Sequence, residues 1–264
     1  MPQAKATSIA ADGGRVALIT GGASGIGLAI VRRLLDDGIR VAFVSRQEDH
    51  VARALDHLGR DQARLIADAI DVTCEEKMAA FVDRVRRRWD DVTILVNNAG
   101  ISPKRSDPAT PWMMQTSAQE WQSVIAVNLN GPFMLTRLIA PAMIRRRMGR
   151  IVNIGSLAGR AVPHIAGPHY AASKAGLVGL TRAVARDLAP FGITVNCVAP
   201  GRILSDMTGP ADSEINRVAL SRIPLGRFGT ADEVAGLVGF LVGSPAAAFL
   251  TGATLDVTGG EFAA

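Results

Sequence analysis

The sequence predicts an α/β fold in which a single doubly wound parallel sheet of about seven strands carries helices on both faces. Short apolar runs alternate with longer amphipathic segments along the 264 residues, and the first apolar run leads directly into a glycine-rich loop. No internal repeat, low-complexity block or linker divides the chain. Strands that alternate with helices of this length form parallel sheets with right-handed crossovers. The pattern therefore indicates one continuous sheet.

Each expected strand is a short apolar run, and in chain order the runs are Val16–Ile19, Val41–Val44, Arg64–Ala67, Thr93–Val96, Arg150–Ile154, Thr194–Val198 and Thr254–Val257. Helical spacing of apolar residues predicts helices over Gly25–Asp37, Glu48–Leu58, Glu75–Trp89, Ala118–Arg147, Tyr170–Leu188 and Ala231–Val242. Gly38 ends the first of these helices, as glycine commonly does. Ser102–Thr116 is rich in Pro, Ser and Thr and is expected to be a loop.

Composition excludes several classes of protein. Hydrophobic residues make up 48% and charged residues 20%, which predicts a packed core. The two cysteines, Cys74 and Cys197, are far apart and lack metal-ligand spacing, so we expect no disulfide framework, no metal site and a cytoplasmic location. No apolar stretch reaches the length of a bilayer span, and residues 1–14 lack the apolar run of a signal peptide. We therefore expect no membrane partner.

Basic residues exceed acidic ones, giving a formal net charge of +5, and they cluster at Arg86–Arg88 and Arg145–Arg147. Solvated helix faces explain such clusters in most proteins. No helix-turn-helix, zinc finger or aromatic RNA-binding motif accompanies them, so nucleic acid is not an expected partner. An acidic partner or a phosphorylated ligand stays open.

A glycine-rich loop connects the first strand to the first helix, in Thr20-Gly-Gly-Ala-Ser-Gly-Ile-Gly27. Glycines allow a sharp turn and a close approach to a pyrophosphate, and the helix N-terminus offers free N–H groups and a partial positive charge. The alternative is a tight strand-to-helix turn without a ligand. The residues expected to bind a dinucleotide here are Gly21, Ser24, Gly25, Ile26 and Gly27.

Ser45 and Arg46 follow the second strand, about twenty residues after the glycines. An acidic residue at this point would bind the ribose 2′-hydroxyl of NAD, whereas a guanidinium suits the 2′-phosphate of NADP. The sequence therefore favours NADP(H), with NAD(H) as the alternative. Two points weaken this preference. Ser24 is neutral, whereas NADP enzymes with a glycine loop of this kind often carry a basic residue at that position, and Arg46 could also be a solvated loop residue.

The expected catalytic group comprises Tyr170, Lys174 and Ser156, together with Asn128. Tyr170 and Lys174 are four residues apart and share a helix face, so the ammonium should lower the pKa of the phenol. The phenol could then exchange a proton near neutral pH. Ser156 follows the fifth strand, where ligands bind in an open parallel sheet, and could donate a hydrogen bond to a carbonyl; an ordinary strand-end cap is the alternative.

Asn128 lies four residues before Pro132, inside the long helix expected over Ala118–Arg147. Proline has no N–H to donate to the carbonyl four residues back. The Asn128 carbonyl should therefore be free to hold a water near the active site. The alternative is that Gly131 and Pro132 only kink the helix.

From about Arg15 to Gly260 the chain resembles the short-chain dehydrogenase/reductase family, whose fold is Rossmann-type. The motifs that carry the resemblance are the glycine loop, Asp71-Val72, Asn97-Asn98-Ala99-Gly100, Asn128, Ser156, Tyr170, Lys174, Pro200-Gly201 and the C-terminal run Asp256-Val257-Thr258-Gly259-Gly260. The resemblance implies one dinucleotide-binding and catalytic domain over 15–264. It also implies a homotetramer that pairs through two long helices. Residues 1–14 are small and polar and are expected to form a flexible tail.

The resemblance implies a role for each motif residue. Tyr170 is the general acid in reduction, Lys174 lowers its pKa and holds the nicotinamide ribose, and Ser156 polarises the carbonyl. Asn128 anchors a water in a proton relay. The remaining residues contact the cofactor: Asp71 and Val72 on the adenine side, Asn98, Ala99 and Gly100 along the ribose and nicotinamide path, and Pro200, Gly201 and Ile203 at the nicotinamide.

The substrate is expected to be a ketone or secondary alcohol. The C-terminal half resembles 3-oxoacyl-(acyl-carrier-protein) reductases in Ile223–Arg227 and Asn196–Gly201, which indicates a 3-oxoacyl thioester. Sugar, polyol and cyclic alcohol dehydrogenases share these stretches and stay open. Pro190 and Phe191 stand where carrier-protein reductases often have basic residues, which speaks against carrier-protein recognition.

Three segments should form the substrate pocket: Ser102–Thr116, Leu157–His169 and Arg202–Ala219. They carry Trp112, Met113, Met114, His164 and Met207, which could line an apolar pocket. The alternative is that Trp112 and the two adjacent methionines pack against a neighbouring subunit or the surface.

A function of another class is a non-catalytic dinucleotide-sensing module, and the complete set of Asn128, Ser156, Tyr170 and Lys174 speaks against it. A serine hydrolase is excluded by the lack of a G-x-S-x-G motif. A P-loop NTPase is excluded because no Lys-Ser or Lys-Thr follows the glycines.

Overall fold

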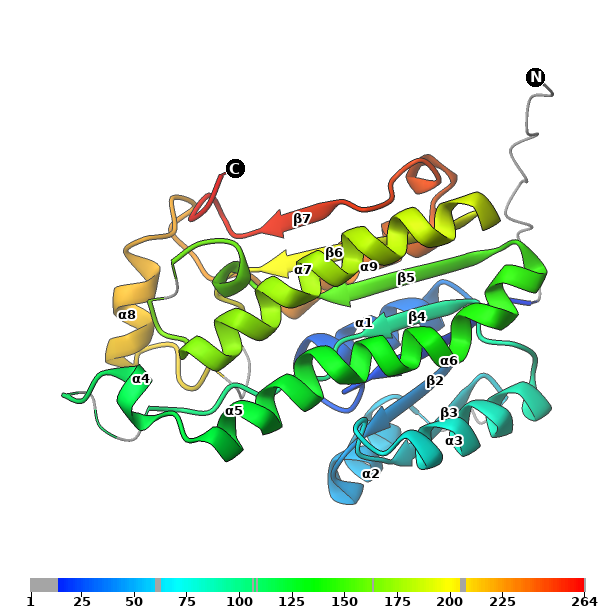
Figure 1. Cartoon of the computed structure of the whole chain (residues 1–264), viewed down its shortest axis with the longest axis horizontal. Coiled ribbons are helices and arrows are strands. Elements are labelled where there is room, and N and C mark those ends of the chain that lie inside the picture. The colour runs from blue at the N-terminus through cyan, green and yellow to red at the C-terminus, as the bar shows by residue number, and fades with distance from the viewer. Residues whose placement is uncertain are drawn as a thin grey trace.

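Seven strands form one sheet in the order β3-β2-β1-β4-β5-β6-β7, and every neighbouring pair is parallel. This computed structural model describes residues 14–59, 63–105, 107, 109–162, 164–204 and 208–263, so most of the tail expected over 1–14 lies outside the described residues, as does Met207. The predicted sheet is confirmed (Figure 1). The strands are β1 Val16–Thr20, β2 Arg40–Ser45, β3 Leu65–Ala69, β4 Ile94–Asn97, β5 Gly149–Ile154, β6 Ile193–Pro200 and β7 Thr254–Val257.

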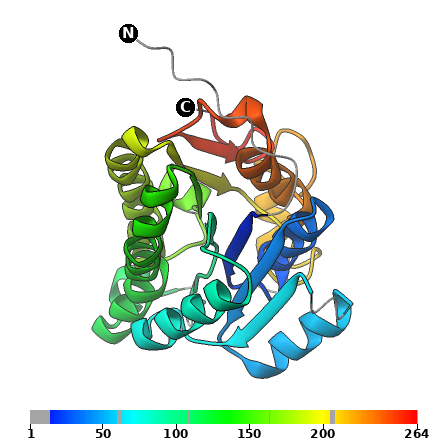
Figure 2. The same ribbon diagram turned by 90° about the vertical axis from the view of Figure 1, so that its right-hand side faces the viewer.

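Helices cover both faces of the sheet, as Figure 2 shows along the strands. The helices on one face are α1 Gly25–Asp36, α2 Glu48–His57 and α9 Ala231–Gly243, whose buried residues share one apolar core. The helices on the other face are α3 Glu75–Arg88, α6 Gly131–Arg146 and α7 Pro168–Leu188, whose buried residues share a second core. The sequence prediction of helices on both faces is confirmed.

Strand β1 shows why the strands are apolar runs rather than alternating sequences. Ala17 and Ile19 contribute to one core, and Val16 and Leu18 contribute to the other. All five residues of β1 are buried. A parallel strand covered on both faces has no solvent side, so apolar residues occupy every position.

The helix expected to run unbroken over Ala118–Arg147 is divided, which corrects the prediction. It consists of α5, Ala118–Ile125, a π-helix over Ala126–Asn130, and then α6. The N–H of Gly131 bonds to the carbonyl of Ala126, one residue further back than in an α-helix. Pro132 therefore lies in the first turn of α6, where the lack of an N–H costs little, rather than in a helix interior.

The run from Ala118 to Arg146 has 29 residues and is apolar enough to cross a membrane by length and composition. This differs from the expectation that no segment reaches that length. In the most apolar 18-residue stretch of this run, 44% is buried inside the protein. The buried side chains of α6, including Leu135, Ile139 and Met143, pack in the core on this face of the sheet. A core helix satisfies the same criteria as a membrane span, and this one packs as a core helix.

Two short helices were not predicted, and both lie beyond the carboxyl ends of the strands. They are α4, Trp112–Gln115, within the segment expected to be a loop, and α8, Glu214–Leu220. Single turns of 3₁₀-helix also occur, at Leu157–Gly159, Ala189–Phe191 and Pro245–Ala247. Figure 1 shows α4 and α8 at the end of the molecule to which the strand arrows point.

Candidate active site

The loop after β1 ends at an uncapped helix N-terminus. Gly21 and Gly25 have positive φ values of 65° and 51°, a conformation that favours glycine. A Cβ on Gly27 would come within 2.0 Å of the Gly21 carbonyl oxygen. Ser24 precedes α1 but makes no capping hydrogen bond with its side chain, and no acidic residue lies in the first turn. The N–H groups of this turn therefore lack a side-chain partner and fit an anionic group such as a pyrophosphate.

Two side chains hold this loop against the end of β4. The hydroxyl of Thr20 accepts hydrogen bonds from the N–H groups of Asn98 and Ala99, each at 3.0 Å. The Asn98 side chain donates to the carbonyls of Thr20 and Gly21, also at 3.0 Å. Sequence reasoning gave Asn98 and Ala99 only cofactor contacts and missed Thr20, although a threonine that ends a strand before glycines was a usable signal. The order of strands reverses between β1 and β4, where doubly wound sheets bind nucleotides.

The residues expected at the adenosine side follow β2 and β3. Ser45 ends β2 and is half-buried, and Arg46 is exposed directly after it. Arg46 makes no ion pair with another described residue. The Asp71 carboxylate accepts hydrogen bonds from the Thr73 N–H at 2.9 Å and hydroxyl at 2.7 Å, which shapes the turn after β3. Val72 is buried beside Gly131.

Tyr170, Lys174 and Ser156 lie together at the carboxyl end of β5. Tyr170 and Lys174 lie one turn apart in α7, and Ser156 follows β5 and caps the short 3₁₀ turn by accepting from the Ala158 N–H at 3.2 Å. The Ser156 hydroxyl is within hydrogen-bonding range of the phenol. The Lys174 ammonium is buried, donates to the Ile154 carbonyl at 2.7 Å and lies 5.7 Å from the Tyr170 ring centroid.

The protonation of this cluster differs from the expectation that Lys174 makes the phenol acidic. Burial raises the pKa of Tyr170, and the hydrogen bond with Ser156 opposes that rise. Burial also lowers the pKa of Lys174 to about 8. The same low-polarity surroundings disfavour both charged forms, so they outweigh the attraction between phenolate and ammonium. Tyr170 is therefore a protonated phenol at neutral pH.

Asn128 is fully buried, and its side chain makes three hydrogen bonds. Its carboxamide oxygen accepts from the Ile101 N–H at 2.9 Å, and its amide nitrogen donates to the Ile101 carbonyl and to the Ser173 hydroxyl, both at 3.0 Å. Ser173 in turn donates to the Tyr170 carbonyl at 2.8 Å. This chain of bonds connects the segment after β4 to the helix turn that carries Tyr170. Sequence reasoning missed Ser173, which carries no recognisable local signal.

The remaining predicted residues line the same edge of the sheet. A Cβ on Gly100 would lie 3.4 Å from the Asn128 side-chain oxygen and 3.5 Å from the Lys174 ammonium nitrogen. Pro200 ends β6, and the Gly201 N–H bonds to the Val257 carbonyl at 2.9 Å. Ile203 is buried in the core and forms an isolated bridge with Gly229. The structure therefore brings Gly100 to the catalytic cluster but directs Ile203 into the core.

An ion pair that sequence reasoning missed ties the segment after Ser156 to β7. Arg160 makes two hydrogen bonds to Asp256, at 3.1 and 3.0 Å, and both side chains are less than a fifth exposed. The bonds to Asp256 raise the pKa of Arg160. The guanidinium also lies 5.2 Å from the Phe262 ring centroid. Burial raises the pKa of Cys197, which lies on β6 near Lys174 and Arg160, to about 11.

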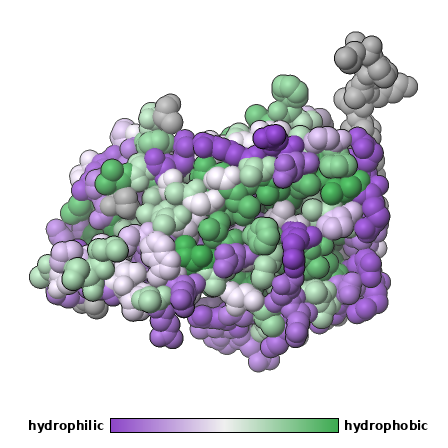
Figure 3. Space-filling view, in the orientation of Figure 1, coloured by the Kyte–Doolittle hydropathy of each residue, from purple (hydrophilic) through white to green (hydrophobic). Residues whose placement is uncertain are grey.

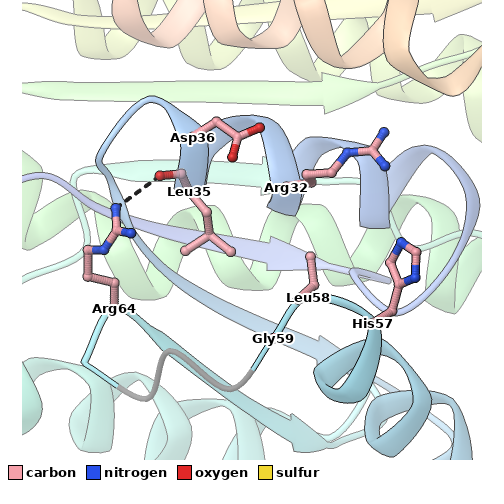
Figure 4. A pocket seen from close by; sticks show the side chains of 7 residues that line it. All are labelled: Arg32, Leu35, Asp36, His57, Leu58, Gly59 and Arg64. Atoms are coloured by element: carbon pink, nitrogen blue, oxygen red, sulfur yellow. Dashed lines mark hydrogen bonds between the residues drawn. The ribbon is translucent and has the colours of Figure 1, made fainter.

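A surface cavity of about 280 Å³ lies apart from these residues. Figure 4 shows it between the last turns of α1 and α2 and the residue before β3, with Arg64 donating to the Leu35 carbonyl at 3.1 Å. The segments that line it adjoin the amino ends of the strands. Ligands of doubly wound sheets bind at the carboxyl ends, so this cavity does not belong to the candidate site. Its lining residues are Arg32, Leu35, Asp36, His57, Leu58, Gly59 and Arg64.

Curated relatives with similar sequences cover nearly the whole chain. A 3-oxoacyl-[acyl-carrier-protein] reductase FabG of Vibrio cholerae is 37% identical over 249 residues, which is 94% of this chain and 98% of that protein. The enzyme of the same name from Pseudomonas aeruginosa is 39% identical over 252 residues, with the same coverage of both chains.

Solved structures agree with the sequence relatives. A 3-oxoacyl-[acyl-carrier protein] reductase from Brucella melitensis with bound NAD has a TM-score of 0.86, 34% identity, and coverage of 96% of this chain and 93% of that one. A second structure of the reductase from this organism has a TM-score of 0.88 and 35% identity, with coverage of 96% and 92%.

The family described as short chain dehydrogenase matches residues 15–216, which include the glycine loop, Ser156, Tyr170 and Lys174. This range covers well over half of the chain. The protein therefore belongs to the short-chain dehydrogenase family of oxidoreductases.

Proposed function

We propose that this protein is an NADP(H)-dependent reductase that converts the ketone of a 3-oxoacyl thioester to a secondary alcohol. The observation that carries the proposal is the cluster of Tyr170, Ser156 and Lys174 beside the uncapped N-terminus of α1. The similarity to reductases of 3-oxoacyl-[acyl-carrier-protein] over 94% of the chain supports the substrate class. The catalytic domain is proposed to comprise residues 15–264.

The residues at the edge of the sheet fit a dinucleotide. Gly21, Ser24, Gly25, Ile26 and Gly27 would hold the pyrophosphate at the free N–H groups of α1, and Arg46 would hold a 2′-phosphate. Asp71 and Val72 would adjoin the adenine, and Asn98 to Gly100 with Pro200 and Gly201 would adjoin the ribose and nicotinamide, whereas the Ile203 side chain packs in the core. When bound, the cofactor supplies the hydride, while the protein supplies orientation and electrostatics.

The chain's own residues handle the carbonyl oxygen. The Ser156 hydroxyl donates a hydrogen bond that polarises the C=O, and the Tyr170 phenol gives its proton to the oxygen as the alcohol forms. Because burial keeps the phenol protonated at neutral pH, Tyr170 starts the cycle in the form that reduction requires. Lys174 holds the ribose and returns a proton to the phenolate, and Asn128 holds the segment at Ile101 against α7.

The reaction is tested by following NADPH absorbance with acetoacetyl thioesters, with cyclic ketones and sugar alcohols for comparison. Tyr170→Phe should lower kcat by about 10³-fold, because proton transfer by a positioned side chain contributes roughly this much. Dinucleotide binding by the variant, measured by titration, should persist. Unchanged turnover by Tyr170→Phe would exclude the mechanism. Wild type that binds dinucleotide but reduces none of these ketones would favour the sensing module instead.

The cofactor preference is tested on Arg46. Removing a guanidinium that binds the 2′-phosphate should raise the KM for NADPH about 10- to 100-fold and leave the KM for NADH unchanged, as expected for one lost charged hydrogen bond. Arg53 is a matched control, because it is an exposed arginine on the next helix, paired with Asp49. Arg53→Ala should change neither constant. Wild type that uses NADH as well as NADPH would contradict the preference.

We also propose that the protein is a cytoplasmic homotetramer that binds neither membranes nor nucleic acid. Both cysteines are free thiols, Cys74 half-buried and Cys197 buried, which fits a reducing compartment. Trp121 on α5 and Phe133 on α6 are 40% and 52% exposed, and exposed large apolar side chains favour a subunit interface. Figure 3 shows apolar side chains between charged ones on the face that carries α6 and α7. Sedimentation velocity measures the assembly directly.

A further inference from the structure

A buried histidine connects the catalytic helix to α5. His169 directly precedes Tyr170 in α7, and its side chain is fully buried. Its Nε2 lies 2.7 Å from a carboxylate oxygen of Glu120, whose side chain is 35% exposed. The contact therefore joins α5, on the protein surface, to the first turn of α7. None of the catalytic steps described above uses it.

The same imidazole packs against helix α4. The rings of His169 and Trp112 have centroids 5.9 Å apart and are tilted by 53°. Gly167, which precedes α7, makes room for them, because a Cβ there would come within 2.4 Å of the imidazole Cε1 and 2.8 Å of the indole Cε3. The backbone of Trp112 is held in turn by the Thr116 hydroxyl, which donates to its carbonyl at 2.9 Å. His169 is thus in contact with both α4 and α5.

The hydrogen-bond pattern assigns the proton on this imidazole. Nδ1 is buried and has no hydrogen-bond partner among the described residues, whereas Nε2 faces a carboxylate. A carboxylate can only accept a hydrogen bond, so Nε2 is the donor in this contact. The imidazole therefore packs against Trp112 on α4 and donates to Glu120 on α5, and these two contacts fix α4 and α5 relative to α7.

Helix α4 carries two of the most exposed apolar side chains of the described residues. Met113 and Met114 are 73% and 78% exposed. They lie in the segment Ser102–Thr116. Figure 1 shows α4 and the first turn of α7 at the same end of the molecule, the end to which the strand arrows point. The position of α4 relative to Tyr170 therefore decides where these flexible apolar side chains meet a substrate chain.

We propose that His169 and Glu120 are a positioning pair that holds Trp112 and α4 beside the catalytic tyrosine, and so sets the affinity for the acyl part of the carbonyl substrate. The proposal rests on the proposed reductase function. The pair touches neither the reacting oxygen nor the dinucleotide. Its loss should therefore act on the KM for the ketone, more strongly for longer acyl chains, and leave the KM for the dinucleotide unchanged.

Two substitutions at His169 separate hydrogen bonding from packing. His169→Phe keeps a ring against Trp112 but removes the donor, and should raise the KM for a long-chain 3-oxoacyl thioester about tenfold, as expected for one lost hydrogen bond to a charged group. His169→Gln keeps an N–H donor and should restore most of that loss.

Glu120→Ala removes the acceptor at a half-exposed site. The double variant His169→Phe/Glu120→Ala should be no worse than either single variant.

Thr181→Val is the matched control. Thr181 is buried in the middle of the same helix and accepts a hydrogen bond from Asn153 at 2.9 Å, far from α4. This variant should lower Tm without changing either KM. An unchanged ketone KM in both His169→Phe and Glu120→Ala, or additive effects in the double variant, would overturn the pairing. If wild type reduces no 3-oxoacyl thioester, the proposed function fails instead, and the variants are then compared by Tm and by quenching of Trp112 fluorescence.

Discussion

The glycine loop after β1 and the catalytic cluster beside α7 lie at the same edge of the sheet but are held by different kinds of contact. Two side chains hold the loop against the segment after β4: Asn98 donates to the carbonyls of Thr20 and Gly21, and the Thr20 hydroxyl accepts from the N–H groups of Asn98 and Ala99. Glycines allow the φ values of the loop. Buried polar side chains hold the cluster, through Asn128, Ser173 and Lys174. Added side-chain volume should therefore disrupt the loop and its dinucleotide binding. Changes in charge or hydrogen bonding should instead disrupt catalysis by the cluster.

The largest effect is expected in the loop, from Gly27→Ala. The added Cβ would lie 2.0 Å from the Gly21 carbonyl oxygen and 2.6 Å from the Asn98 amide nitrogen, so the loop or the helix must move. We expect a loss of about 1–3 kcal/mol in the free energy of unfolding, as for other overpacked sites, together with loss of measurable dinucleotide binding. Thermal unfolding and a dinucleotide titration measure the two effects.

Gly179→Ala is the control for this prediction. Gly179 lies in α7, is exposed, and a Cβ there would meet nothing within 4 Å. The substitution should raise stability by about 0.5–1 kcal/mol, because alanine has the higher helix propensity. If Gly27→Ala binds dinucleotide as wild type does, the close packing of the loop is not what forms the nucleotide site.

The same difference explains how much the sequence predicts. The sheet, most helix boundaries and the glycine loop follow from local patterns, since apolar runs and glycines act within a few residues. The partners of Arg160 and His169 do not, because Asp256 is 96 residues away and Glu120 is 49 residues away. The π-helix before Pro132 also escapes a prediction that assumes regular helical spacing. The pKa of Tyr170 was expected to fall because the helical spacing shows Lys174 but does not show burial.

The second effect concerns the charge in the catalytic cluster. Burial lowers the pKa of Lys174 to about 8, so the ammonium is charged below this pH and neutral above it. Tyr170 keeps its proton through this range, since its pKa is raised above the ordinary value of 10.0. The value of kcat/KM for reduction should therefore fall by about tenfold for each pH unit above about 8. Dinucleotide titrations at each pH serve as the control. A profile that stays flat to pH 10 would exclude Lys174 as a charged participant.

The smallest effect on function is expected from the ion pair that holds the segment after Ser156. Asp256→Asn keeps the shape of the side chain but leaves the Arg160 guanidinium, only 16% exposed, without a counter-ion. We expect a loss of about 1–3 kcal/mol in the free energy of unfolding and a fall of a few-fold in kcat, because the turn that carries Ser156 is no longer fixed to β7.

Asp232→Asn is the matched control, since Asp232 pairs with Arg32 at a site where the two side chains are 70% and 49% exposed. Such exposed pairs contribute little, so neither Tm nor kcat should change. Equal effects of the two substitutions would mean that the buried pair does not position Ser156, and that backbone hydrogen bonds between β5 and β6 are enough to hold the catalytic edge.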